Sequence, residues 1–180
     1  MDALIPYVIP VKGLRHGVHA FKFQIDDAFF KHFEESPVQQ GQIEMTMTFD
    51  KRPDLIILEF DFEGTVKTEC DRCLAPINLP IADTQRLMVK FSEEEEPEDA
   101  EVVYMHPEAQ QLNVARYVYE FICLAIPMIR VYDCQNDPDR PCNEDMLRYL
   151  DNAADTSEEA NRDEQNPFRE ALKKWKDNDN

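Results

Sequence analysis

The chain has 180 residues, a length typical of one domain with a short additional segment. Its 43% hydrophobic and 10% aromatic content is enough for a packed core, which excludes a disordered chain. The formal net charge of -18, from 19 basic and 37 acidic residues, disfavours direct binding to nucleic-acid phosphates and favours a basic protein partner. An acidic surface that serves only solubility is the alternative.

Export and membrane insertion are not expected from this sequence. No stretch reaches the roughly 20 apolar residues of a membrane span, and residues 1–10 carry no basic run of the kind that opens a signal peptide. We therefore expect a cytoplasmic protein without membrane contact.

The first half of the chain predicts β-strands, because apolar and polar residues alternate there with a period of two. The alternation is clearest over residues 43–49 and 58–66, and it recurs over 21–25 and 87–91. Such a pattern buries one face and leaves the other in water, which is typical of an antiparallel sheet. Between the first strands, Asp26 and Asp27 precede three phenylalanines and predict a short helix with acidic residues at its positive end.

The second half predicts helices. Asn113 can cap a helix that runs to about Ala125 and is ended by Pro127. This helix is apolar on most faces, so we expect it to be the buried central helix. Arg116 and Glu120 share its one polar stripe, and their i, i+4 spacing predicts an ion pair. A second helix should follow Asn143.

The C-terminal part predicts a linker and a final amphipathic helix. Residues 151–165 are polar and acidic without periodicity, as in a flexible linker, and the helix covers residues 166–176. Phe168, Ala171, Leu172 and Trp175 form one apolar stripe on this helix. The stripe either packs on its own domain or docks in a partner's groove with Trp175 as anchor.

Together these elements predict an α+β fold. An antiparallel sheet from residues 3–91, either open or closed as a barrel, is packed by the buried helix 113–126, and short C-terminal helices follow. The expected organisation is a single domain over residues 1–150, the linker 151–165 and the helix 166–176.

An acidic run separates the two halves of the domain. Residues 92–108 hold eight acidic residues and no lysine or arginine. A like-charge run next to a proline is typical of a solvated loop. The alternative is a surface that attracts a basic partner through Glu93, Glu94, Glu95 and Glu96.

The five cysteines are an odd number in a chain without an export signal, so we expect reduced thiols or metal ligands. Cys70 and Cys73 lie three positions apart, and on a tight turn their thiolates can bind one metal. With Cys134 and Cys142 they give a candidate site for one structural zinc. Metal-free thiols are the alternative. A redox pair is disfavoured, because two prolines follow where such chemistry needs a helix.

Catalysis has little support in the sequence. Four histidines lie outside any metal or triad motif, and four glycines form no phosphate-binding loop. We therefore expect a non-catalytic protein without a small-molecule substrate.

At Cys70-Asp71-Arg72-Cys73-Leu74 the chain resembles the YceD-like family, also described as domain of unknown function 177. The resemblance runs from about Ile43 to the C-terminus. It implies a role in ribosome assembly, since the family is associated with accumulation of large-subunit ribosomal RNA. Tyr132 stands where related sequences often carry His or Cys, so a metal site here would need Cys134 in its place. Similar features, in chain order, are the acidic stretch after Phe91, the pattern Glu120, Leu124, Pro127, and the terminal Asn166-Pro167-Phe168 with Leu172-Lys173-Lys174.

The resemblance and the charge together predict a ribosome-biogenesis accessory protein. It would support synthesis, processing or stability of large-subunit rRNA by binding a basic ribosomal protein or assembly factor, and it would bind naked rRNA weakly. The alternatives are a zinc-dependent nucleic-acid-binding module and a thiol oxidoreductase that uses Cys70 and Cys73.

Overall fold

The computed structural model describes residues 4–34, 36–93, 101–134, 137, 140–150 and 152. The chain divides into two compact units. The first unit runs to Asp71 and continues from Pro76 to Tyr132, and the second contains Arg72–Ala75 and the chain from Asp133. The domain boundary expected at residue 150 falls inside the second unit.

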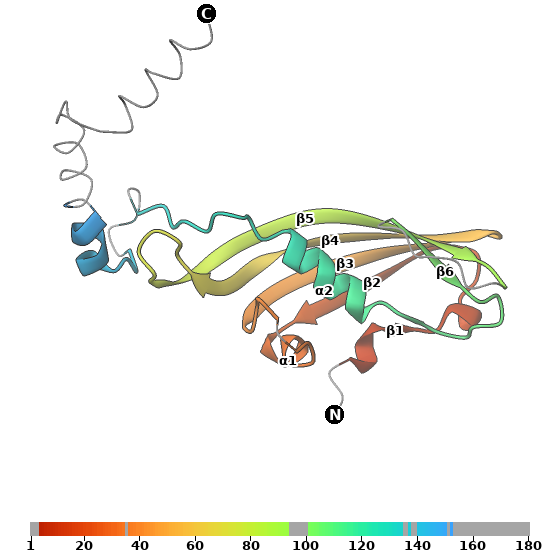
Figure 1. Ribbon diagram of the computed structural model, residues 1–180. Helices are drawn as coiled ribbons and strands as arrows, with labels where there is room; N and C mark the ends of the chain where they lie inside the picture. Colours follow the sequence, from red (N-terminus) through yellow and green to blue (C-terminus); the bar gives the residue numbers. More distant parts are fainter. Residues whose placement is uncertain are drawn as a thin grey trace, which may run out of the picture. The chain divides into compact units, whose positions relative to one another are not determined.

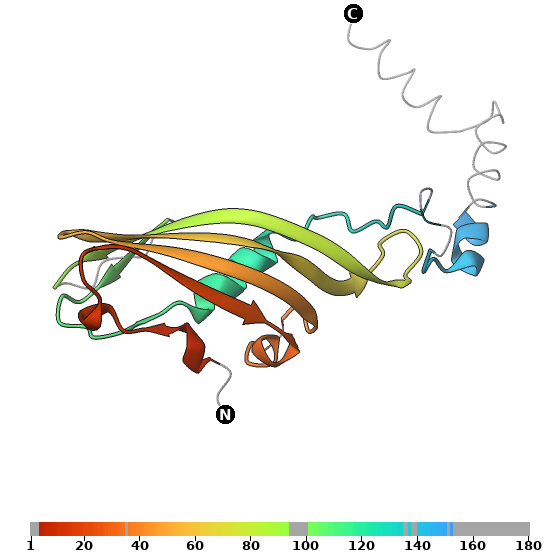
Figure 2. The same ribbon diagram turned by 180° about the vertical axis from the view of Figure 1, so that it is seen from behind.

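A five-stranded sheet is the main element of the first unit (Figures 1 and 2). Its first four strands are antiparallel neighbours in chain order, while the last runs parallel to the fourth. The α+β prediction is confirmed, and the sheet is open with no closure into a barrel. The strands in spatial order are β2 (Gly17–Ile25), β3 (Gly41–Lys51), β4 (Leu55–Glu69), β5 (Pro76–Phe91) and β6 (Val102–Met105).

The period-two alternation sorts the side chains onto two faces of this sheet. Met47, Phe49 and Phe60 are completely buried, whereas Glu44 and Asp61 on neighbouring positions of the same strands are exposed. The antiparallel pattern and its buried face therefore follow from the sequence as predicted.

Helix α2 (Ala115–Leu124) packs on the apolar face of the sheet (Figure 1). Val118 and Ile122 of this helix are completely buried, and the ring of Phe121 lies 5.2 Å from that of Phe60 on β4. The helix is the buried central helix that the sequence predicts. Burial of each large apolar side chain of this helix stabilises the fold by roughly 1.5–3 kcal/mol.

The structure places Val114 at the N-cap of α2, one residue after the predicted Asn113, and it contains the predicted Arg116–Glu120 pair. Asn113 accepts a hydrogen bond from the backbone N–H of Ala115 at 2.9 Å, and Arg116 pairs with Glu120 at 2.8 Å. The short helix α1 (Asp27–Phe30) begins after Asp26, whose Oδ1 accepts from the N–H of Ala28 at 2.9 Å. This cap satisfies a backbone donor that the first helical turn leaves without a partner.

The N-terminal segment lies on the same face of the sheet as α2 (Figure 2). Strand β1 (Val8–Ile9) follows the short 3₁₀ turn η1 (Ile5–Tyr7) and pairs with β7 (Leu112–Asn113) just before α2. A second 3₁₀ turn, η2 (Val11–Gly13), is fixed by Lys51, whose Nζ donates to the carbonyl of Val11 at 2.8 Å. The sequence did not predict either short strand.

Tyr7 joins this segment to the aromatic core. Its ring lies 5.0 Å from that of Phe23 and 4.8 Å from that of Phe29. Burial of the phenol, with the nearby Asp26 carboxylate, raises the pKa of Tyr7 to about 12. Tyr7 therefore stays neutral across the physiological range and acts as a packing residue.

In the second unit, residues 144–150 and Asn152 are helical, which confirms the helix predicted after Asn143. The Asn143 side chain accepts from the N–H of Met146 at 3.2 Å, and Arg140 pairs with Glu144 at 2.6 Å. Apart from Asn152, the predicted linker 151–165 and the predicted helix 166–176 lie outside the described residues.

Candidate functional site

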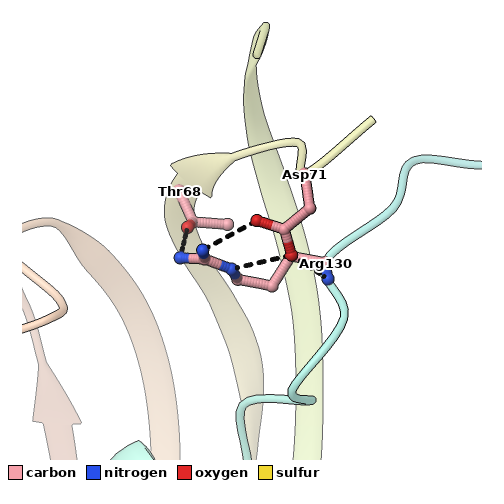
Figure 3. Close-up of polar contacts among 3 residues, drawn as sticks. All are labelled: Thr68, Asp71 and Arg130. Carbon is pink, nitrogen blue, oxygen red and sulfur yellow. Dashed lines mark hydrogen bonds and ion pairs between the residues drawn. The ribbon is translucent and has the colours of Figure 1, made fainter. Parts of the chain in front are cut away.

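The turn that follows β4 carries the Cys-Asp-Arg-Cys motif, and its Asp71 is held by Arg130 (Figure 3). Asp71 Oδ2 accepts from the backbone N–H of Arg130 at 2.7 Å, and Oδ1 accepts from Nη2 at 2.8 Å. The N–H of Asp71 donates in return to the Arg130 carbonyl at 2.7 Å, and Arg130 Nη1 donates to Thr68 Oγ1 at 2.9 Å. We call Thr68, Asp71 and Arg130 the arginine clamp.

The clamp ties the end of β4 to the segment that leaves α2. Hydrogen bonds to Asp71 from the backbone and then from the side chain of Arg130 hold the pKa of this carboxyl below its ordinary value of 3.8. The two side chains are about one third exposed, so solvent screens their ion pair. The clamp therefore gives the Asp of the motif a structural role.

Cys70 and Cys73 flank this turn; both are completely buried and neither is in a disulfide. The chain continues from them into β5 and not into a helix, so the motif lacks the helix N-terminus that lowers a thiol pKa in redox Cys-x-x-Cys sites. Leu74, the next residue, has a φ of 57°, a left-handed conformation that is rare for a bulky side chain. Burial raises the pKa of the Cys123 thiol on α2.

The second pair of cysteines differs from the expectation of reduced thiols. The structure joins Cys134 and Cys142, eight positions apart, in a disulfide. A short intervening segment allows the two residues to meet, which their loose sequence spacing did not indicate. In this oxidised form neither residue has a thiolate to offer a metal.

Among the residues that the structure describes, no group of three or more His, Cys, Asp or Glu side chains is placed to hold a metal ion. A structural zinc on Cys70, Cys73, Cys134 and Cys142 therefore stays a prediction. Binding by all four residues would require the Cys134–Cys142 disulfide to be reduced.

The sheet face opposite α2 carries two adjoining grooves across β2, β3, β4 and β5. Their volumes are about 880 Å³ and about 510 Å³, and they share Gln24, Glu44, Glu63 and Ala82. No described element covers this face of the first unit (Figures 1 and 2). We call it the open sheet face. The charged residues that line the two grooves are Asp26, Glu44, Asp61, Glu63, Asp83 and Lys22.

The partner-binding residues predicted from the sequence are mostly not placed. Glu93 is exposed at the end of the described segment that follows β5. The rest of that set, Glu94, Glu95, Glu96, Phe168, Leu172 and Trp175, lies outside the described residues. The open sheet face was not identified from the sequence, although the polar residues that alternate with apolar ones along each strand indicated it.

Comparison with known proteins gives one result that covers most of the chain. Residues 58–176 match the model of the YceD family, described as large ribosomal RNA subunit accumulation protein. The comparisons with curated proteins and with solved structures gave no match. In the part of the chain that the structure describes, no helix is long and apolar enough to cross a membrane. The match begins inside β4 and includes the cysteine motif, α2 and the arginine clamp, so this chain belongs to the YceD family.

Proposed function

We propose that this protein is a non-catalytic accessory factor for large-subunit ribosomal RNA, and that it acts by binding a basic ribosomal protein or assembly factor. The observation that carries the proposal is the family match over residues 58–176, whose description names accumulation of this RNA. The charge of -18 supports contact through protein, because an anionic surface gains nothing from counterion release on RNA.

Deleting the gene tests this role. The expected result is a lower ratio of mature large-subunit rRNA to small-subunit rRNA, restored when the intact gene is supplied on a plasmid. Both fast and slow growth should be sampled, because assembly defects depend on the demand for ribosomes. An unchanged ratio under both conditions would remove the proposal.

Direct binding to naked rRNA should be weak at physiological salt. Repulsion between the phosphates and the acidic protein opposes association, and no release of counterions offsets it. Filter binding or fluorescence anisotropy over a salt series measures this directly. Tight binding that survives raised salt would instead favour a nucleic-acid-binding module.

The C-terminal stripe of Phe168, Leu172 and Trp175 is a second candidate contact for the same partner. Removing residues 160–180 separates docking from packing. Loss of rRNA accumulation at an unchanged melting temperature supports docking in a partner's groove. A large fall in melting temperature would mean that Trp175 packs on its own domain.

A further inference from the structure

We infer that the open sheet face binds an extended Lys/Arg-rich segment of a protein, with Glu44 and Glu63 as its central contacts. The inference rests on the proposed function in one respect, namely that the partner is a basic protein. It adds the surface, the chemistry of the bound segment and the residues that recognise it.

The charge of the two grooves indicates the kind of partner. Five carboxylates line them against one ammonium group, that of Lys22. A surface of one sign concentrates ligands of the opposite sign and orients them on approach. The remaining polar groups there, such as those of Gln24, Gln42 and Thr46, provide donors and acceptors for a peptide backbone.

Glu44 and Glu63 lie directly opposite each other on β3 and β4. Both are exposed, and neither has a hydrogen-bond or ion-pair partner among the described residues. Like charges facing each other across two strands destabilise a sheet. Asp61, two positions from Glu63, accepts a hydrogen bond from the Thr84 hydroxyl at 3.1 Å, whereas Glu44 and Glu63 have no such donor in the part of the chain that the structure describes.

A cationic side chain between Glu44 and Glu63 would relieve their repulsion and bind both carboxylates. Four strands about 4.8 Å apart make a path of roughly 14 Å, which four or five extended residues can span. Apart from Pro80 and Ala82, the exposed side chains that line the grooves are polar or charged, so the occupant is expected to be hydrophilic and strongly basic. RNA is disfavoured because its phosphates would face these carboxylates.

A labelled peptide of about eight alternating lysine and serine residues tests the surface with the full-length protein. Titration followed by backbone amide NMR should shift residues 22–24, 42–46, 61–65 and 82–84. The double variant E44Q/E63Q should bind about threefold to tenfold more weakly, because two surface ion pairs are lost. The matched control D54N/E108Q removes two exposed acidic charges outside the grooves and should bind as the wild type does.

The melting temperature of each variant shows whether weaker peptide binding results from a loss of folding. E44Q/E63Q should melt at or above the wild-type temperature, because it removes a facing like-charge pair. Shifts that gather at residues 93–101, equal weakening in the control, or tighter binding of a single-stranded RNA of equal length would each overturn the inference. The titration tests the surface alone and the gene deletion tests the role in rRNA alone, so the two failures are distinguishable.

Discussion

Gly64 lies in the middle of β4, where the backbone of β3 passes too close for any side chain. A Cβ added at this position would lie 2.2 Å from the carbonyl oxygen of Gln42 and 2.6 Å from Cα of Ile43. To restore an ordinary contact, the oxygen must recede from 2.2 to 3.4 Å. Both obstructing atoms belong to the backbone, so no side-chain rotation relieves the overlap in Gly64→Ala.

A strand separation of this size weakens the hydrogen bonds on either side of the Ile43–Gly64 pair. Losing about two of them costs roughly 1–3 kcal/mol, and the overpacking itself adds about 1–3 kcal/mol. We therefore expect Gly64→Ala to destabilise the protein by about 2–6 kcal/mol. For a chain of this length, at about 2–4 °C per kcal/mol, that corresponds to a fall in melting temperature of about 4–24 °C.

Thermal and urea unfolding followed by circular dichroism measure the effect. Gly13→Ala is the matched control, because nothing lies within 4 Å of its added Cβ and its φ is not in the left-handed range. The control should leave stability unchanged or raise it by about 0.4–1 kcal/mol through the unfolded state. A Gly64→Ala variant within 1 kcal/mol of the wild type, or a control that is equally unstable, would refute the reasoning.

Three further predictions concern the cysteine turn. Asp71→Asn should lower the urea midpoint at neutral pH. The folded state lowers the pKa of the Asp71 carboxyl, so the stabilisation by this carboxylate is lost when it is protonated. The difference from the wild type should therefore shrink as the pH falls below 3.8. Equal differences at pH 7 and pH 3 would contradict that assignment. Leu74→Gly should raise stability by about 1 kcal/mol in the same assay, since glycine adopts the φ of 57° freely and the leucine side chain is 56% exposed. A structural zinc on Cys70 and Cys73 predicts about one metal per chain by elemental analysis and a lower melting temperature after chelation, whereas metal-free protein after gentle purification would exclude it.

The long strands and the central helix could be predicted because each has a strong periodicity of its own. The alternation around Met45 and Phe60 determines which side chains face the core, and the spacing of Val118, Phe121 and Ile122 determines the buried stripe of α2. Local capping by Asp26 was equally visible, because its partners are two and three residues away.

The missed features depend on contacts between distant parts of the chain. Strand β6 has four residues and pairs with β5 in parallel, and β1 has two, so neither shows a period that sequence reasoning can use. The clamp joins Asp71 to Arg130 across 59 positions. The sequence identified the cysteine motif, yet the partner of its aspartate became visible only when the fold brought the two segments together.

The parallel pairing of β6 has a consequence for solubility. It covers only Met88–Phe91 of β5, and no other described strand pairs with the outer edge of residues 76–87. An uncovered edge of this length is a template on which a second chain can add a strand and begin an aggregate. Pro76 and Pro80 lie on this stretch, and each removes a backbone donor that an incoming strand would need. The two prolines thus protect the longest strand of the protein from self-association at the edge that its own short neighbour leaves open.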